Sequence, residues 1–151
     1  VFKGYWNMPE KTKAELRDDG FFITGDLGKF DEDGYLHIVG RDKDLIISGG
    51  YNIYPKELEM FLDEQENVLE SAVIGVPHPD FGETPLALLV PKEGKKPNLK
   101  KIMENIHKEI ARFKHPKQLI LIETLPRNTM GKVQKNILRQ EYGATYLNKQ
   151  N

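Results

Sequence analysis

A pair of short apolar runs, residues 71–76 and 86–90, constrains the fold more than any other feature of the sequence. Both runs are rich in leucine and β-branched residues, and the turn-forming residues Pro77, Pro79 and Gly82 separate them. Apolar runs of this length between turn signals are typical of strands. We therefore predict that the two runs form a pair of strands.

Two amphipathic segments lie on either side of this strand pair in the sequence. Pro55 suits the first position of a helix because its φ angle is already fixed. Asn98 is expected to cap a second helix, which Pro116 ends. Apolar residues recur at helical spacing in both segments: Leu58, Phe61 and Leu62 in the first, and Leu99, Ile102, Met103, Ile106 and Ile110 in the second.

The remaining segments complete an α+β pattern. Residues 1–40 are interpreted as turns and short strands, and Asp33 and Gly34 form the turn of a hairpin over residues 30–39. The other expected elements are strands over residues 45–48 and 118–123 and a terminal helix to about Tyr142, with Ile137 and Leu138 facing inward. No βαβ repeat or Gly-x-Gly-x-x-Gly fingerprint occurs. We predict a small mixed sheet with flanking helices, preceded by a short β-rich segment.

A charged link of Asp42, Lys43 and Asp44 stands between two apolar strands and is a plausible domain joint. The 151 residues, 38% of them hydrophobic, fit one small domain with a piece of a neighbour attached. We therefore expect one unit over residues 1–42 and a second over residues 43–151.

Composition excludes several classes of protein. No apolar run approaches the roughly 20 residues that span a bilayer, and a signal-peptide pattern is absent at the start. Without cysteine the chain has no disulfide and no zinc–thiolate site, which favours a reducing compartment and a cytoplasmic location. The four histidines are never paired at ligand spacing, so we expect no metal held by this chain alone.

Charge is distributed unevenly along the sequence. The balance of Lys and Arg against Asp and Glu is −3 over residues 1–40, −7 over residues 41–91 and +9 over residues 92–151. A basic last third suits a polyanionic small molecule, although an ordinary solvated surface would carry the same charges. Nucleic acid is a third alternative, with residues 113–117 as its only weak candidate.

Asp26 closes the first of three constellations that could carry chemistry, the segment Phe-Ile-Thr-Gly-Asp over residues 22–26. An ionised carboxylate accepts two hydrogen bonds at once, which suits the adjacent hydroxyls of a ribose. The alternative is a simple aspartate turn.

Arg41 begins the second constellation, since it is a cation at a strand end beside the joint. Further on, Gly49 and Gly50 allow a ligand to approach the backbone closely. The alternatives are a surface ion pair of Arg41 with Asp42 or Asp44 and a plain glycine turn.

Lys132 lies in the third constellation, Pro-Arg-Asn-Thr-Met-Gly-Lys-Val-Gln-Lys over residues 126–135. It is not a P-loop, because Pro126 replaces the first glycine and Val133 replaces the magnesium-binding hydroxyl. A mobile glycine-containing loop that presents a lysine remains, and its charge could neutralise a developing phosphate or carboxylate. The alternative is a solvated lysine at a helix start.

The order of these three motifs resembles the closing motifs of the adenylate-forming superfamily, and the resemblance covers nearly the whole chain. That superfamily includes acyl-CoA synthetases, luciferases and peptide-synthetase adenylation domains. The resemblance implies that residues 1–42 end a large N-terminal domain and that residues 43–151 form a lid domain. The lid rotates between formation of acyl-AMP from acid and ATP and displacement of AMP by CoA.

The resemblance also implies roles for individual residues. Lys132 is similar to the lysine that stabilises charge as the acid attacks ATP, and Lys43 occupies the hinge position. Asp26 and Arg41 match the nucleotide-binding positions. The positions that match CoA-binding residues are Gly49, Gly50, Tyr51, Phe81, Phe113, His115 and Lys117. His115 replaces an arginine of some relatives, so a phosphate contact there would depend on pH.

Among subfamilies, residues 4–12, 18–29 and 125–136 resemble malonyl-CoA synthetases. The resemblance implies a carboxylic acid, ATP, CoA and the chain's own N-terminal domain as partners, with magnesium held by ATP and that domain. A medium- or long-chain fatty acid–CoA ligase is the nearest alternative. A stand-alone nucleotide- or CoA-binding module is the alternative from another class. Nucleic acid is not an expected partner, and this chain alone is expected to be inactive.

Overall fold

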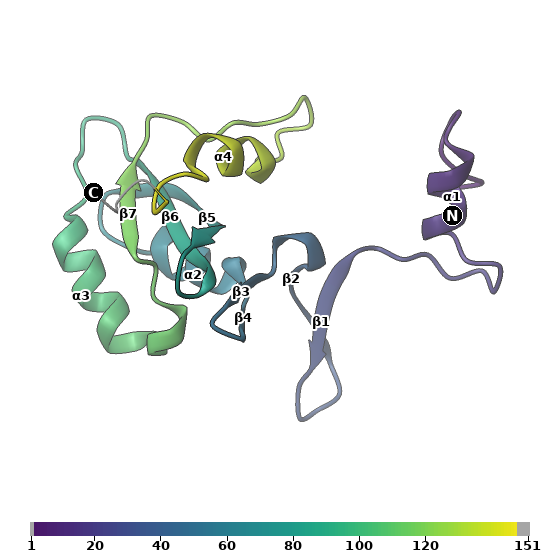
Figure 1. Cartoon of the computed structure of the whole chain (residues 1–151), viewed down its shortest axis with the longest axis horizontal. Coiled ribbons are helices and arrows are strands. Elements are labelled where there is room, and N and C mark those ends of the chain that lie inside the picture. Colours follow the sequence, from purple (N-terminus) through teal and green to yellow (C-terminus); the bar gives the residue numbers. More distant parts are fainter. Residues whose placement is uncertain (1, 148–151) are drawn as a thin grey trace. The chain divides into compact units, whose positions relative to one another are not determined.

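The computed structural model describes residues 2–147 (Figure 1). The chain divides into two compact units, Val1–Lys43 and Asp44–Asn151, which we call the N-terminal unit and the C-terminal unit. Their boundary, between Lys43 and Asp44, lies within the charged link of residues 42–44 and one residue after the expected division at 42/43. A 3₁₀ turn, Asp42–Asp44, carries the chain from one unit to the other.

The N-terminal unit contains the helix α1 (Pro9–Glu15) and an antiparallel hairpin of β1 (Asp26–Phe30) and β2 (Leu36–Arg41). The hairpin confirms the prediction, and its turn is fixed by the Asp31 carboxylate, which accepts the N–H groups of Asp33 and Tyr35. The helix α1 corrects the expectation of turns and strands alone. Its seven residues bury no side chain, so they carry no apolar periodicity from which a helix could be predicted.

The C-terminal unit combines a five-stranded mixed sheet with three helices. Its strands are β3 (Ile46–Ser48), β4 (Tyr51–Ile53), β5 (Val68–His78), β6 (Gly82–Pro91) and β7 (Gln118–Leu121). Its helices are α2 (Pro55–Asp63), α3 (Leu99–Glu109) and α4 (Lys135–Tyr142). The α+β class predicted from the sequence is therefore confirmed.

Strand β6 organises the sheet. It pairs antiparallel with β5 from Val68 opposite Pro91 to His78 opposite Gly82, as the two apolar runs predicted. Along its other edge it meets β3 at Gly82 and runs parallel to β7 from Leu86 onward. One strand thus connects the β3–β4 turn with β7.

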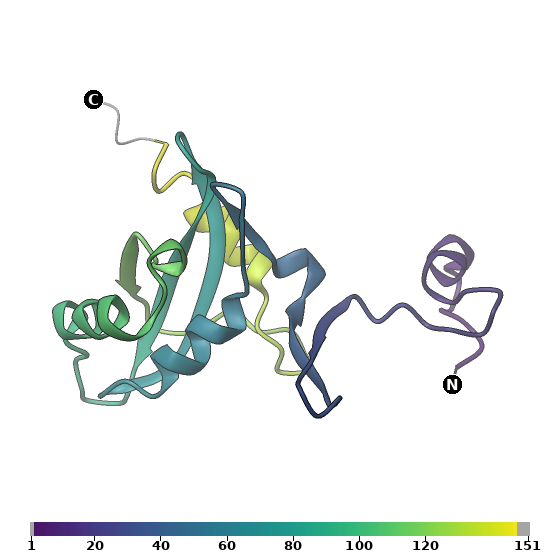
Figure 2. The ribbon, with the colours of Figure 1, turned by 90° about the horizontal axis from the view of Figure 1, so that it is seen from below.

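The sheet has two covered faces (Figure 2). Side chains alternate along β5 and β6, so that Val73, Ala87 and Leu89 pack with α2 and α3, whereas Ile74 and Leu88 pack with α4. Each fully buried leucine or isoleucine contributes about 1.5–3 kcal/mol through burial of apolar surface. Both faces are therefore cores, and the unit is held together through its sheet.

The helix α3 begins as predicted but ends earlier. Asn98 caps its start, since the Asn98 Oδ1 accepts the N–H of Lys101 at 3.1 Å. However, α3 ends at Glu109, well before Pro116, because Ile110 is already extended and a separate 3₁₀ turn, Arg112–Lys114, follows.

In α4, the inward residue is Leu138, which is fully buried. The helix packs against the sheet through Leu138 and Tyr142, which are four positions apart and share one face. Ile137 therefore faces outward, contrary to prediction, and is 36% exposed.

Candidate functional site

A cavity of about 880 Å³ lies beside the β3–β4 turn of the C-terminal unit. Its lining comes from the β3–β4 turn, the start of β6, α3 and the 3₁₀ turn that follows α3. The lining residues are Ser48, Gly49, Tyr51, Phe81, Thr84, Met103, His107, Arg112, Phe113, His115, Pro116 and Lys117. Six of the seven residues predicted to bind CoA are among them, and Gly50 is the exception.

Two glycines form the β3–β4 turn beside this cavity, and one of them, Gly49, lines it. Gly49 and Gly50 have φ angles of +55° and +83°, which side-chain-bearing residues rarely adopt. The N–H of Gly49 donates to the carbonyl of Phe81 at 3.0 Å and ties the β3–β4 turn to the chain just before β6. A Cβ added at Gly49 would lie 3.4 Å from the Phe81 ring, whereas one at Gly50 would face open space.

Aromatic rings give the cavity flat walls. The rings of Tyr51 and Phe113 stack with their centroids 4.8 Å apart. The ammonium of Lys117 lies 4.7 Å from the centre of the Phe81 ring, and the Lys117 N–H donates to the carbonyl of Pro85 at 3.1 Å. Aromatic surface next to a cation suits a ligand that carries both a planar ring and anionic groups.

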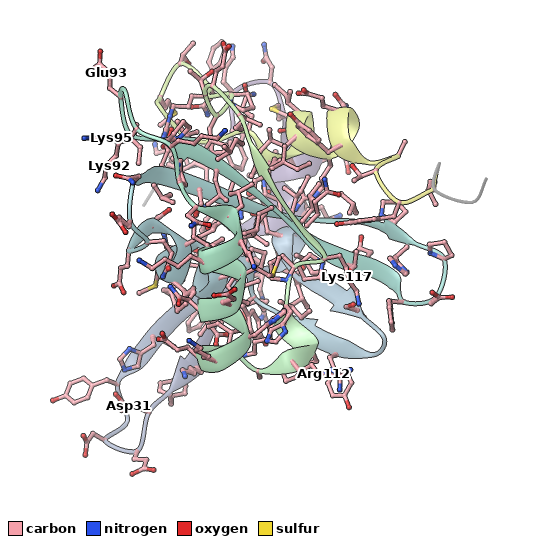
Figure 3. The ribbon with its side chains drawn as sticks, turned by 90° about the vertical axis from the view of Figure 1, so that its left-hand side faces the viewer. Asp31, Lys92, Glu93, Lys95, Arg112 and Lys117 are labelled. Atoms are coloured by element: carbon pink, nitrogen blue, oxygen red, sulfur yellow. The ribbon has the colours of Figure 1, made fainter. Side chains whose placement is uncertain are left out.

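Positive charge gathers at the end of α3. Figure 3 shows Arg112 and Lys117 near this end, whereas Lys92, Glu93 and Lys95 lie in the loop before the helix. Among residues 2–147, neither Arg112 nor Lys117 forms an ion pair, so both charges are available at the cavity.

The two cavity histidines stack on each other with centroids 4.8 Å apart. His115 places Nε2 2.8 Å from the carbonyl oxygen of Ile110, and because a carbonyl only accepts, this nitrogen carries the hydrogen. His107 was not singled out from the sequence, because it lies on the exposed face of a helix where a polar residue is ordinary.

Other cavity residues were also outside the sequence prediction. Thr84 is 1% exposed, and its hydroxyl has no hydrogen-bond partner among the described residues. Ser48, Met103, Arg112 and Pro116 complete this group. Only Arg112 had a sequence signal, since it lies in the basic last third.

Lys132 lies in a different place, in the loop between β7 and α4. We call residues 126–134 the lysine loop. An isolated bridge joins Arg127 to Val133, and Val133 packs against the α4 face of the sheet. The Lys132 side chain is exposed and forms no ion pair within the described chain. It is therefore free to meet an anion.

Asp26 and Arg41 come together in the N-terminal unit, where they are opposite residues of β1 and β2. Arg41 Nε lies 2.9 Å from Asp26 Oδ1, and its Nη1 donates to the carbonyl of Thr24 at 2.7 Å. Arg41 thus pairs with neither Asp42 nor Asp44, and Asp44 instead pairs with Arg139 at 2.7 Å. Lys43 is exposed in the 3₁₀ turn at the unit boundary.

The uneven charge of the sequence is partly neutralised inside the C-terminal unit. Five ion pairs join the acidic middle third to the basic last third: Asp44–Arg139, Glu57–Lys114, Glu59–Lys135, Glu66–Lys101 and Glu70–Arg127. Five of the 14 basic residues of the last third are therefore already paired. Within residues 113–117, the candidate for nucleic acid, Phe113 is stacked and Lys114 is paired.

Within residues 2–147, no group of three or more His, Asp or Glu side chains lies close enough together to hold a metal ion. No helix in this part of the chain is long and apolar enough to cross a membrane.

Comparison with known proteins gives a family match. Residues 57–132 match the model of the AMP-binding enzyme C-terminal domain. The chain is 43% identical over 145 residues to the long-chain-fatty-acid–CoA ligase FadD13 of Mycobacterium tuberculosis strain H37Rv, covering 96% of this chain and 28% of that protein. It is 44% identical to the long-chain-fatty-acid–CoA ligase of Bacillus subtilis strain 168, covering 93% of this chain and 25% of that protein.

A solved structure is similar over the same extent. The crystal structure of ATP-bound MatB from Rhodopseudomonas palustris is 58% identical, with a TM-score of 0.86, and the match covers 97% of this chain and 29% of that one. The chain thus spans about a quarter to three-tenths of the length of these relatives.

Proposed function

Because the chain belongs to the AMP-binding enzyme C-terminal domain family, we propose that it is the lid part of an ATP-dependent acid–thiol ligase. In the first half-reaction, a carboxylate oxygen bonds to the α-phosphorus of ATP and pyrophosphate leaves. In the second, the CoA sulfur bonds to the acyl carbon, and AMP leaves with the electrons of the broken bond. The reaction as a whole converts acid, ATP and CoA into acyl-CoA, AMP and pyrophosphate.

The observation that carries this proposal is the placement of two separate features on one sheet. The lysine loop packs on the α4 face through Val133, whereas the cavity draws Met103 and His107 from α3 on the other face. Both features belong to one compact unit. A unit built in this way presents one feature at a time to a fixed partner, as two successive half-reactions require.

Lys132 serves the first half-reaction in this proposal. Its ammonium neutralises negative charge that develops as the carboxylate attacks the phosphate, in a site closed to water. Exposure and the absence of an ion pair within the described residues leave its charge available for that role. Lys43 is the proposed pivot, and its place at the unit boundary supports this.

The cavity serves the second half-reaction. CoA carries a purine, phosphates and a long pantetheine arm that ends in a thiol. The stacked Tyr51 and Phe113 rings suit the purine, whereas Arg112, His115 and Lys117 suit phosphates. No atom lies within 4 Å of the position of a Cβ at Gly50, which leaves room for the pantetheine arm to approach the backbone there.

ATP is the proposed ligand of the N-terminal unit. The Asp26 carboxylate would accept hydrogen bonds from the ribose hydroxyls. Its Oδ1 lies 2.9 Å from Arg41 Nε, and this ion pair holds the carboxylate in place. Residues 1–42 would then be the end of a larger nucleotide-binding domain. Magnesium would come with ATP and would be held by ATP and the larger N-terminal domain.

The acid is proposed from sequence resemblance. Residues 4–12, 18–29 and 125–136 resemble malonyl-CoA synthetases, so we propose malonate or a similar dicarboxylate, in a cytoplasmic enzyme. The names of the relatives FadD13 and the Bacillus subtilis ligase favour a long-chain fatty acid as the alternative. A panel of malonate, methylmalonate and fatty acids on the full-length enzyme distinguishes these acids.

Lys132→Ala in the full-length enzyme tests the central role. We expect acyl-adenylate formation to fall by about 10²–10³-fold, the usual effect of losing one preorganised electrostatic contact. Thioester formation from supplied acyl-adenylate and CoA should keep its rate. Pyrophosphate exchange measures the first step and thiol consumption the second. Equal loss in both steps would contradict the proposal, and a stand-alone CoA-binding module would show neither activity.

A further inference from the structure

The backbone of Lys132 is fixed from both sides by a single residue, Asn128. The Asn128 side-chain oxygen accepts the N–H of Lys132 at 2.9 Å and the N–H of Met130 at 3.0 Å. The Asn128 N–H donates to the carbonyl of Lys132 at 2.9 Å. Both main-chain polar groups of Lys132 are therefore bonded to Asn128, and only the lysine side chain is left to move.

The rest of the lysine loop is bonded in the same compact manner. Gly131 donates its N–H to the carbonyl of Asn128 at 2.9 Å and has a φ of +79°, which permits the sharp turn before Lys132. Gln134 donates its N–H to the carbonyl of Pro126 at 2.8 Å and closes the loop at its base. The sequence suggested a mobile loop, but the structure shows one crossed by hydrogen bonds.

Ion pairs fasten both ends of the loop to the C-terminal unit. Before the turn, Arg127 pairs with Glu70 of β5 and also donates to the carbonyl of Gly131 at 2.6 Å. After the turn, Lys135 lies 2.6 Å from the carboxylate of Glu59 on α2.

Burial makes the second ion pair a firm anchor. The Glu59 and Lys135 side chains are only 10% and 16% exposed. Glu59 also accepts the N–H of Val73 at 2.9 Å, so its carboxylate is fixed to β5 as well. A lysine at the start of a helix opposes the helix dipole, and the buried partner Glu59 offsets this.

We propose that Asn128 is a positioning residue for Lys132, because it fixes the Lys132 backbone within the lysine loop. The inference rests on the proposed role of Lys132 in acyl-adenylate formation. A lysine side chain has four rotatable bonds, so any added freedom of its backbone widens the positions that the ammonium can take. Displacement of a catalytic group by about 1 Å can lower a rate by about 100-fold.

The test uses the full-length enzyme with malonate, or the best fatty acid of the panel, and measures both half-reactions in each variant. Asn128→Ala removes the acceptor, and we expect acyl-adenylate formation to fall by about 10-fold to 100-fold while thioester formation from supplied acyl-adenylate is unchanged. Asn128→Ser keeps an uncharged oxygen that makes the same turn bond more weakly, so it should recover part of the lost rate.

Asn98→Ala is the matched control. Asn98 also uses its side-chain oxygen to accept one backbone N–H, but it caps α3 and lies outside the lysine loop. Its loss should lower the melting temperature and leave the ratio of the two half-reaction rates unchanged. A shift of that ratio in Asn98→Ala as large as in Asn128→Ala would mean that general destabilisation explains the effect, and would overturn the inference.

The remaining outcomes separate this inference from the proposed function. If Lys132→Ala loses acyl-adenylate formation and Asn128→Ala keeps it, the positioning role is wrong and the role of Lys132 stands. Equal loss of both half-reactions in Asn128→Ala, or a serine variant no better than alanine, also overturns the positioning role. If Lys132→Ala keeps full acyl-adenylate formation, both ideas are wrong.

Discussion

The two units of the chain differ in what they bury. None of the described residues 2–43 is buried, and the large side chains of Trp6, Phe21 and Phe30 are 88%, 72% and 73% exposed. The C-terminal unit holds every buried residue of the described chain, on both faces of its sheet. One unit is therefore folded around its own core, whereas the described part of the other unit has no buried core.

Expression of the two units as separate chains should give the largest difference between them. We expect residues 44–147 to unfold cooperatively on heating, since that unit contains both cores. Residues 1–43 should give a poorly dispersed amide NMR spectrum, because a chain of this length without a core, disulfide or metal rarely folds. A dispersed spectrum for residues 1–43 would show that the N-terminal unit needs no partner.

Lys135→Met measures how much a buried ion pair stabilises the C-terminal unit. Methionine keeps most of the volume but leaves the buried Glu59 carboxylate without its cation, so unfolding free energy should fall by about 3 kcal/mol. Lys101→Met is the matched control, because Lys101 and Glu66 form an exposed pair at 3.2 Å whose loss should cost under about 1 kcal/mol. Urea unfolding measures both, and equal costs would contradict the anchoring role of Lys135.

In this chain alone, Phe30→Ala should have the smallest effect of these changes. Phe30 is 73% exposed, so its removal from this chain should change the unfolding free energy by no more than about 0.5 kcal/mol. In the full-length enzyme, where a larger domain would cover it, the cost should rise to about 3 kcal/mol. Thermal unfolding of both forms provides the measurement. The same small cost in both forms would mean that Phe30 stays exposed in the whole protein.

The sequence predicted most of the C-terminal unit because its local signals agree with its packing. Pro55 begins α2, Asn98 caps α3, and the two apolar runs pair as β5 and β6. By contrast, α1 has no apolar face to detect. The end of α3 was also missed, because Ile110 continues the apolar spacing while its backbone is already extended.

Only part of the candidate site was predicted from the sequence. Resemblance to relatives identified Gly49, Phe81 and Phe113, and the structure brings all three to one cavity. It gave no reason to select His107, which joins the cavity only because α3 places it beside His115.

Partners far away in the sequence explain the burial of Glu59, which the sequence did not predict. Glu59 follows Leu58 on a helix and would be assigned to the solvent face, yet it is 8% exposed. Its partners Val73 and Lys135 are far away in the sequence. No local pattern contains such a pairing, so only the folded chain reveals it.

The five ion pairs that join the acidic and basic thirds have a consequence for synthesis. The acidic stretch leaves the ribosome first, and its own negative charges repel one another while their partners are still absent. The basic stretch follows and is attracted to it over a distance of roughly 8 Å at physiological salt. The last third of the chain therefore both completes the sheet with β7 and supplies the counter-charges of the acidic stretch.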